Sequence, residues 1–379
     1  MRTLWLLFAQ VVTAGLAIYM VVAAVRGPRE PSRLQSGTVE RPAAILQAPA
    51  GATPAFSYRE AAARAMPAVV NILTSKVVRP RRFLEDPFFR RFFGDRVPEE
   101  EQQSLGSGVI VSPDGYILTN NHVVEAADDI QVILADGRKA GAKIVGTDPE
   151  TDLAVIRVAL RDLPVIVLGH SDEARVGDVV LAIGNPFGVG QTVTMGIISA
   201  LGRKNLHINP FENFIQTDAA INFGNSGGAL IDTGGNLIGI NSAIYSQSGG
   251  SVGIGFAIPT STAKSVMEAI IKTGYVVRGW IGIESQDITP ELAENFGLAA
   301  RSGVIIAGVV RNGPADRAGL RPGDILLSIN QQPVADTAGM LTQIAALSPG
   351  TAATMTVLRK NQRAQLSVQV ALRPRSPTE

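Results

Sequence analysis

The chain has 379 residues, of which 46% are hydrophobic and 18% are charged, and its formal net charge is +1. The charged share lies below the ~25% usual in soluble globular chains, which excludes bulk disorder, and the length predicts two folded domains with further segments. The absence of cysteine excludes disulfides, zinc–thiolate sites, iron–sulfur clusters and a cysteine nucleophile. The even charge balance gives no reason to expect nucleic acid as a partner, and no metal or cofactor is implied.

Residues 3–25 form an apolar run without a charged residue. A helix that crosses a bilayer needs about 20 apolar residues, so this run is long enough to span. A cleaved secretory signal is the alternative, but its apolar region is usually only about 7–15 residues long. We therefore predict a transmembrane anchor over residues 1–25, which contacts the lipid bilayer through residues 3–25. Both alternatives place the rest of the chain outside the cytoplasm.

Residues 26–55 are predicted to form a flexible linker, because proline recurs there among small residues and disfavours helix and sheet alike. At about residue 56 the pattern changes. A short helical run ends at Pro67 and is followed by β-branched runs separated by turns. These runs cover residues 69–78, 106–112, 116–120, 129–134, 142–147, 153–158, 178–184, 193–201, 229–244 and 252–258.

Strands at this spacing are typical of a β-sandwich or β-barrel. No helical period of about ten residues separates them, which argues against alternating β-α-β units. We therefore predict a mainly β domain over residues 56–275. Two longer irregular stretches interrupt it, a Phe- and Arg-rich loop at 79–104 and a second loop at 202–213.

One serine lies in a run that suits a nucleophile, Gly224-Asn225-Ser226-Gly227-Gly228. A nucleophilic serine needs backbone N–H groups turned toward a developing oxyanion, and glycine tolerates the dihedral angles that this requires. Gly224, Asn225 and Ser226 are the predicted oxyanion segment, with the N–H groups of Gly224 and Ser226 as donors. The alternative for this run is an ordinary glycine-rich turn.

His122 and Asp152 are the predicted partners of this serine. His122 follows a strand, whereas His170 and His207 do not, and histidine is the side chain best suited to exchange a proton near neutral pH. Asp152 directly precedes a buried-looking strand, and a buried carboxylate fixes the tautomer of such a histidine. The alternatives are a histidine and an aspartate that stabilise turns. The order His, Asp, Ser is that of chymotrypsin.

The runs TNNHVV, TDLAVI and QTDAAINFGNSGGAL resemble the three catalytic motifs of the HtrA (Deg) serine proteases. The resemblance covers residues 60–370 and implies a chymotrypsin-like double β-barrel. Asp218 is the competing acid, but its position in the motif does not match the triad member. The resemblance places Ala220 at the base of the specificity pocket, with Ile221, Asn241 and Ser242 beside it. Since Ala220 offers no carboxylate to lysine or arginine, we expect cleavage after Val or Ala.

Residues 259–275 read as one helix that links the protease domain to a second domain over residues 276–373, followed by a tail at 374–379. The run GPADRAGLRPGDILLSIN and a helical run at 336–347 resemble a PDZ domain. Such domains bind peptide C-termini by strand addition. By this resemblance, the carboxylate-binding loop consists of Trp280, Ile281, Gly282 and Ile283. The alternative is a strand start with a packed tryptophan.

A chain with an N-terminal apolar segment and one PDZ domain resembles the DegS-type branch of the family. This implies a homotrimer in the bacterial inner membrane, with a single membrane pass and both domains in the periplasm. It also implies a stress response in which C-terminal peptides of misfolded outer-membrane proteins activate cleavage of a membrane-bound anti-sigma factor. Arg203 matches the regulatory arginine of the family, with a solvated loop charge as the alternative. Two other functions remain open, a catalytically silent peptide-binding or chaperone-like protein and a secreted soluble protease.

Overall fold

A computed structural model describes most of the chain, namely residues 2–25, 57–75, 103–125, 127–185, 190–244, 251–295 and 303–374. The chain divides into two units between Ala55 and Phe56. The predicted linker at 26–55 lies outside the described residues, as does the predicted loop at 79–104 apart from its last two residues, which begin a strand.

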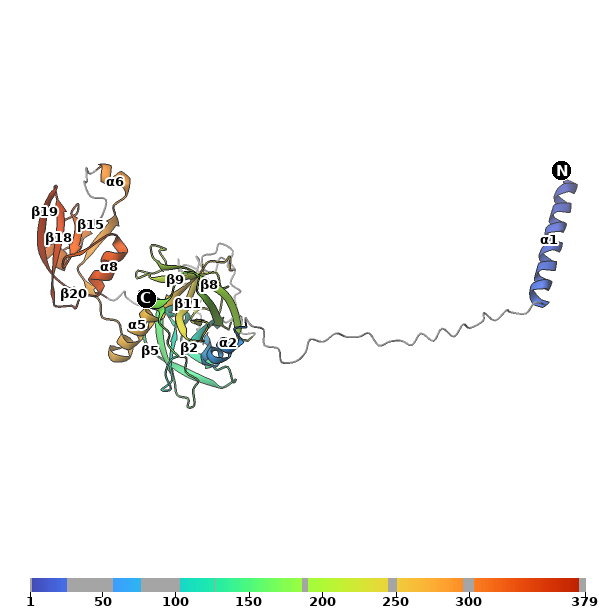
Figure 1. Ribbon diagram of the computed structural model, residues 1–379, viewed down its shortest axis with the longest axis horizontal. Coiled ribbons are helices and arrows are strands. Elements are labelled where there is room, and N and C mark those ends of the chain that lie inside the picture. The colour runs from blue at the N-terminus through green and yellow to red at the C-terminus, as the bar shows by residue number, and fades with distance from the viewer. Residues whose placement is uncertain are drawn as a thin grey trace. The chain divides into compact units, whose positions relative to one another are not determined.

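The N-terminal run forms one helix, α1 (Arg2–Val25), as its apolar composition predicts (Figure 1). Within the described residues, no helix combines the length and the apolar character that a membrane crossing requires. The predicted transmembrane span is therefore not confirmed.

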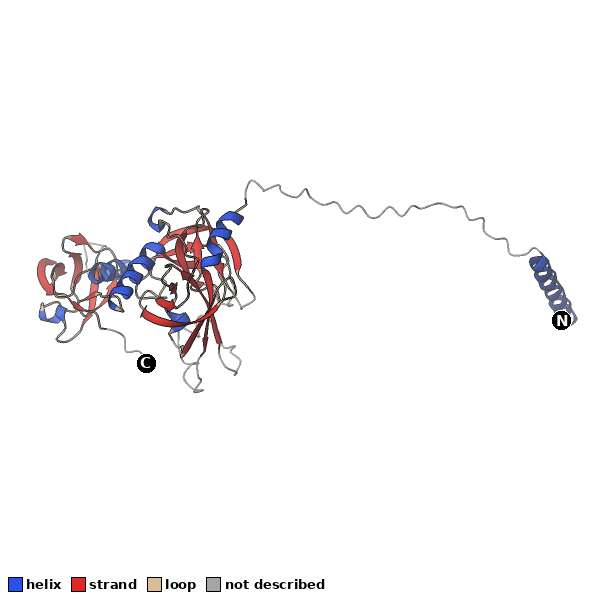
Figure 2. Ribbon diagram, turned by 90° about the horizontal axis from the view of Figure 1, so that it is seen from below, coloured by secondary structure: helices blue, strands red, loops and turns tan. Residues whose placement is uncertain are grey.

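The described strands between residues 69 and 259 close into two barrels (Figure 2). A short helix, α2 (Arg59–Ala65), and a 3-10 turn, η1 (Met66–Ala68), lead into the first barrel. In order around this barrel the strands are β1 (Val69–Ser75), β2 (Gln103–Ile110), β3 (Tyr116–Thr119), β6 (Leu153–Val158), β5 (Lys139–Asp148) and β4 (Asp129–Ile133). β-branched and leucine side chains from all parts of the barrel are buried at its centre, and this burial stabilises the closed sheet.

The second barrel is ordered β10 (Ala229–Ile231), β11 (Leu237–Ile244), β12 (Gly255–Pro259), β9 (Phe214–Thr217), β8 (Thr192–Arg203) and β7 (Val179–Gly184). Here the sequence prediction was wrong at three points. The run 229–244 forms two strands, because Asp232 accepts hydrogen bonds from the backbone of Gly234 and Asn236 and closes a turn. β8 continues to Arg203, into the predicted loop. β9 was missed because its four residues are too few to establish an alternating pattern.

A helix follows the second barrel and leads to the domain predicted to be a PDZ domain. α5 (Thr260–Thr273) follows Pro259 and ends at Gly274, whose φ of 81° lies in the left-handed region that glycine adopts without strain. It packs tightly on β5, since a Cβ on Gly146 would lie 2.3 Å from the Gly274 oxygen. The predicted linking helix is thus confirmed.

Residues 279–372 form the PDZ domain, which has its own buried core. A two-stranded sheet pairs β13 (Gly279–Trp280) with β20 (Ala371–Leu372). The main sheet is ordered β14 (Ile283–Asp287), β15 (Val304–Val309), β16 (Ile325–Ile329), β18 (Ala352–Arg359) and β19 (Gln362–Gln369), with β17 (Gln332–Pro333) beside β16. The helices are α6 (Pro290–Asn295), α7 (Pro314–Arg317) and α8 (Thr337–Ala345). Asp336 caps α8, because its carboxylate accepts a hydrogen bond from the Gly339 N–H at 2.6 Å.

A buried ion pair joins the start of the PDZ domain to the first barrel. The guanidinium of Arg278 donates to both carboxylate oxygens of Asp148 at 2.6 Å. Glu150 contacts Arg278 and also Arg373, which follows β20. Asp148 in turn accepts a hydrogen bond from the Thr151 hydroxyl, one residue before Asp152. The turn that carries Asp152 is therefore in direct contact with the first residues of the PDZ domain.

Candidate active site

His122 and Asp152 lie together because β3 and β6 are neighbours. The two strands pair antiparallel with Thr119 opposite Ala154. His122 lies just beyond the end of β3, in the one-turn helix α4 (Asn121–Val124), and Asp152 lies just before β6. The Asn121 N–H donates to the Asp152 carbonyl at 3.2 Å, which ties the two ends together.

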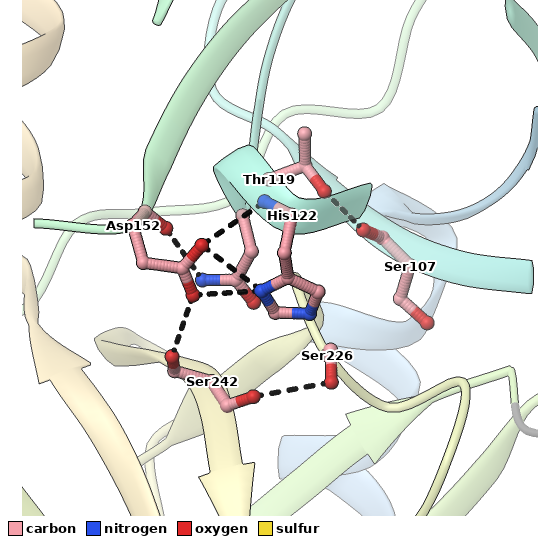
Figure 3. A network of polar contacts seen from close by, with 7 residues as sticks. Ser107, Thr119, His122, Asp152, Ser226 and Ser242 are labelled. Atoms are coloured by element: carbon pink, nitrogen blue, oxygen red, sulfur yellow. Dashed lines mark hydrogen bonds and ion pairs between the residues drawn. The ribbon is translucent and has the colours of Figure 1, made fainter. Parts of the chain in front are cut away.

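The Asp152 carboxylate accepts hydrogen bonds from three groups (Figure 3). His122 Nδ1 lies 2.9 Å from Oδ1 and 2.8 Å from Oδ2, and the His122 backbone N–H donates to Oδ1 at 3.0 Å. The Ser242 hydroxyl donates to Oδ2 at 3.0 Å. Only 4% of Asp152 is exposed, so these donors replace the water that a carboxylate would otherwise bind.

The backbone of Asp152 is also held in an uncommon conformation, with a φ of 58°. Its carbonyl accepts a hydrogen bond from the side-chain amide of Asn120 at 2.9 Å, in addition to the Asn121 N–H. Left-handed backbone is costly for most side chains and tolerated best by glycine, asparagine and aspartate. The fold thus fixes the orientation of this carboxylate through its main chain as well as its side chain.

Asp152 controls the protonation of His122. Burial alone would lower the pKa of His122, but the charge of Asp152, its hydrogen bond and the charge of Glu125 together raise the pKa above its ordinary value. The ring nitrogen Nδ1 faces the carboxylate, so Nε2 is the nitrogen suited to exchange a proton with another group.

Ser226 reaches this pair from the second barrel, where it lies between β9 and β10. Its hydroxyl donates to the carbonyl of Ser242 at 3.1 Å, and the hydroxyl of the same Ser242 contacts Asp152 (Figure 3). Its own carbonyl accepts a hydrogen bond from the Ser107 N–H at 2.8 Å. The three predicted residues therefore meet where the two barrels join.

The segment around Ser226 has the backbone pattern of an anion-binding turn. The N–H groups of Asn225, Gly227 and Gly228 donate to the carbonyls of Asn222, Asn241 and Asn225. Within the described residues, the N–H groups of Gly224 and Ser226 donate to no protein carbonyl. Gly224 has a φ of 89° and Gly227 a φ of 80°, values that favour glycine. The two predicted oxyanion donors thus have no backbone carbonyl as a partner among the described residues.

The residues predicted for the specificity pocket have different surroundings. Ala220 is half-buried, and its carbonyl accepts a hydrogen bond from the Thr194 hydroxyl at 2.8 Å. Ile221 belongs to the core of the second barrel. The amide of Asn241 donates to the carbonyls of Ile183 and Ala229 inside the barrel, and Ser242 contacts Asp152 and Ser226. The side chains of Asn241 and Ser242 thus bind within the protein.

The competing residues lie elsewhere. Asp218 is exposed, and its carboxylate accepts a hydrogen bond from the Ile197 N–H at 2.7 Å. His170 precedes the 3-10 turn η3 (Ser171–Glu173), and His207 lies in the loop after β8, both exposed. Among the three histidines, His122 is the one in contact with a buried carboxylate.

In the PDZ domain, Trp280–Ile283 forms the connection from β13 to β14. Gly282 has a φ of 75°, and a Cβ there would lie 2.9 Å from the Trp280 ring, so glycine permits a close approach. Ile281 is buried, and its carbonyl accepts a hydrogen bond from the Ala315 N–H at 2.9 Å. β14 is the edge strand of its sheet, with β15 on one side.

Arg203 lies exposed at the end of β8. Its Nε donates to the side-chain oxygen of Gln216 on β9 at 2.8 Å. In the described part of the chain the guanidinium of Arg203 thus contacts a side chain on the neighbouring strand.

Sequence reasoning missed the residues that support the site. Ser242 was assigned to the specificity pocket, whereas its hydroxyl contacts Asp152. Asn120 and Ser107 were not singled out at all. The signal available in the sequence was a polar residue at a position where the apolar pattern around it predicts burial. Ser107 and Asn120 are both 0% exposed.

We predict that Asp152→Asn lowers the pKa of His122, because the charge that raises it is removed while the burial that lowers it remains. The measurement is an NMR titration of the ring, which is tractable since the chain has only three histidines. Asp218→Asn is the control and leaves the His122 titration in place. An unchanged His122 pKa in Asp152→Asn would contradict the contact described here.

Comparison with known proteins agrees with this geometry. The family described as Trypsin-like peptidase domain matches residues 106–240, and the family described as PDZ domain matches residues 279–370. A protein of Hahella chejuensis named "Probable periplasmic serine endoprotease DegP-like" is 44% identical over 344 residues, which are 87% of this chain and 73% of that protein. A relative of the same name from Chlamydia trachomatis is 46% identical over 301 residues, which are 78% of this chain but 61% of the relative.

Among solved structures, one described as "HtrA-type protease AlgW with decapeptide" is 56% identical, with a TM-score of 0.75. The match covers 85% of this chain and 100% of that chain. Two closed barrels, a PDZ domain and these relatives together show that the chain belongs to the HtrA-type serine proteases.

Proposed function

We propose that this protein is a periplasmic serine endopeptidase in which Ser226 is the nucleophile, His122 the general base and Asp152 the orienting carboxylate. One observation carries the proposal. The Asp152 carboxylate holds His122 Nδ1, while the N–H groups of Ser226 and of nearby Gly224 bind no backbone carbonyl among the described residues. The relatives named periplasmic serine endoproteases support both the activity and the compartment.

The reaction proceeds in two halves. The Ser226 hydroxyl turns from the Ser242 carbonyl to His122 Nε2, gives up its proton and attacks the peptide carbonyl carbon. The negative oxygen of the tetrahedral intermediate accepts hydrogen bonds from the N–H groups of Gly224 and Ser226. His122 then protonates the leaving amine as the C–N bond breaks. Water, deprotonated by His122, hydrolyses the acyl–enzyme and restores the Ser226 hydroxyl.

We predict that Ser226→Ala abolishes cleavage of casein and that His122→Ala is about as severe, since members of a triad act as a unit. Asp218→Asn is the matched control and keeps wild-type turnover, because its carboxylate lies outside the site. Far-UV circular dichroism shows whether each variant is folded. Wild-type cleavage by folded Ser226→Ala would refute Ser226 as the nucleophile. No cleavage by the folded wild-type chain would instead favour a catalytically silent, chaperone-like peptide-binding protein.

The proposed substrates are proteins cleaved after small or medium aliphatic residues such as Val and Ala. Ala220 at the base of the proposed pocket carries no charge, and Ile221 provides apolar surface behind it. A preference for Arg or Lys would need a carboxylate at that position. A membrane-bound anti-sigma factor, cleaved in a stress response, is the substrate that the DegS-type resemblance favours.

We further propose that C-terminal peptides of misfolded outer-membrane proteins bind the PDZ domain and activate the protease. A peptide would add to the edge strand β14, with its carboxylate at the loop Trp280–Ile283. The solved structure of the relative AlgW is described as holding a decapeptide, which supports peptide binding.

Two contacts support coupling between the PDZ domain and the active site. Arg278, at the start of the PDZ domain, pairs with Asp148, and its guanidinium lies 4.6 Å from the ring centre of Phe211 in the loop after β8. Arg203 at the start of that loop binds Gln216 on β9, the strand that leads to the Ser226 segment. A movement of the loop could therefore change the oxyanion segment while the triad stays in place. By linkage, an activating peptide must bind the active state more tightly than the inactive state.

We predict that a saturating hydrophobic C-terminal peptide raises the cleavage rate, and that Arg203→Ala reduces this activation at least fivefold. Peptide affinity, measured by fluorescence anisotropy, stays within about twofold, because Arg203 lies outside the PDZ domain. Arg161→Ala, which removes another exposed arginine, leaves activation unchanged. Equal basal and peptide-saturated rates, with the peptide bound, would refute activation.

A homotrimer is proposed from the family resemblance, and an exposed apolar stripe on β8 supports an association of subunits. Val193 is 37% exposed, Met195 61% and Ile197 40%. Exposed apolar surface of this kind on a soluble domain often marks a contact with another protein.

Attachment to the inner membrane through residues 3–25 is also a proposal. The charge-free run supports it. We predict that the full chain stays in the membrane pellet after carbonate extraction, and that deletion of residues 1–26 yields a soluble, folded enzyme. Release of the full chain by carbonate would favour a secreted soluble protease.

A further inference from the structure

Ser107 is a fully buried serine that lies between the two barrels. It is on β2, flanked by two glycines on which a Cβ would collide with neighbouring side chains, at 2.5 Å from Val123 for Gly106 and 2.7 Å from Ile117 for Gly108. The β2 backbone also lies close to the Ser226 segment, since a Cβ on Gly227 would lie 2.1 Å from the Ser107 carbonyl oxygen. The exposed fraction of Ser107 is 0%.

Every polar group of Ser107 faces the active site or its support. Its N–H donates to the Ser226 carbonyl at 2.8 Å, and its hydroxyl donates to the Gly224 carbonyl at 2.5 Å. The hydroxyl oxygen accepts a hydrogen bond from the Asn185 N–H at 2.9 Å. The Thr119 hydroxyl donates to the Ser107 carbonyl at 2.7 Å (Figure 3).

These contacts hold the carbonyls of Gly224 and Ser226, the two residues whose N–H groups are the predicted oxyanion donors. Gly224 has no side chain to restrict its dihedral angles, so its peptide planes can rotate more freely than those of other residues. The hydrogen bond from Ser107 to the Gly224 carbonyl limits this rotation from outside. The Asn185 N–H occupies a lone pair of the hydroxyl, which leaves the hydroxyl proton directed at Gly224.

We propose that Ser107 is a positioning residue for the oxyanion hole and acts through its hydroxyl. This inference rests on the proposed protease function. Ser107 does not touch the substrate. Its hydroxyl holds the peptide plane between Gly224 and Asn225, which lies between the planes that carry the Gly224 and Ser226 N–H groups, and so restricts the direction of both donors. A preorganised donor stabilises the tetrahedral intermediate more than one that must rotate into place.

The competing explanation is that the Ser107 hydroxyl only supplies a hydrogen bond to the buried Gly224 carbonyl and has no effect on catalysis. Both explanations predict some loss of stability on Ser107→Ala, since a buried carbonyl loses its hydrogen-bond partner. The loss of one hydrogen bond is small beside the usual stability of a folded domain, so the variant is expected to fold. Only a positioning role predicts a selective loss of transition-state binding.

The experiment compares Ser107→Ala with Thr260→Val. Thr260 is a matched control, because it is 3% exposed and its hydroxyl donates to the Leu237 carbonyl at 2.9 Å, away from Ser226. With a fluorogenic peptide substrate, we expect kcat of Ser107→Ala to fall about tenfold to a hundredfold, with KM within about twofold, because the oxyanion donors remain but lose their orientation. Affinity for a peptidyl boronate, which forms a tetrahedral adduct on Ser226, should fall by the same factor.

Thr260→Val should lose stability without losing kcat or boronate affinity. Ser107→Thr keeps the hydroxyl and should retain kcat within about threefold. A folded Ser107→Ala with wild-type kcat and boronate affinity overturns the inference, as does an equal loss of kcat in the Ala and Thr variants. A wild-type chain without Ser226-dependent cleavage would instead overturn the proposed function, and this inference with it.

Discussion

The active-site geometry depends on the hydrogen bonds of one buried carboxylate, that of Asp152. It receives two donors from His122 on the first barrel and one from Ser242 on the second. The Ser242 carbonyl also accepts a hydrogen bond from the Ser226 hydroxyl. Through Ser242, the carboxylate therefore links His122, the proposed base, to Ser226, the proposed nucleophile, across the junction of the barrels. A charge that is 4% exposed is stable only with such partners, so the same contacts that stabilise the junction align the reactive groups.

The mainly β fold and the contact between His122 and Asp152 could be predicted because they leave local patterns. Leu153–Val158 was predicted with its observed limits, and Ser226 was singled out from its glycine neighbours. β9 was missed because a short strand has little periodicity, and the contact of Ser242 with Asp152 was missed because the two residues are 90 positions apart. Contacts of this kind are set by how two barrels pack, and the sequence near either residue does not encode them.

The junction with the PDZ domain follows the same principle. Arg278 and Asp148 form a buried bidentate ion pair, and Asp148 also binds Thr151 in the turn before Asp152. Loss of one partner of such a pair usually costs about 3–5 kcal/mol. The first residues of the PDZ domain therefore stabilise the protease domain beside one of its proposed catalytic residues, and this proximity gives peptide binding a short physical route to the site.

The left-handed backbone of Asp152 determines how experiments at this position should be interpreted. A φ of 58° suits aspartate and asparagine, whereas a left-handed backbone at alanine costs roughly 1–2 kcal/mol. Asp152→Asn therefore removes the charge and preserves the main chain. Asp152→Ala is expected also to move the backbone just before β6 and the Asn120 amide that binds the carbonyl of residue 152. Its effect on activity would therefore combine the loss of the carboxylate with a local backbone rearrangement.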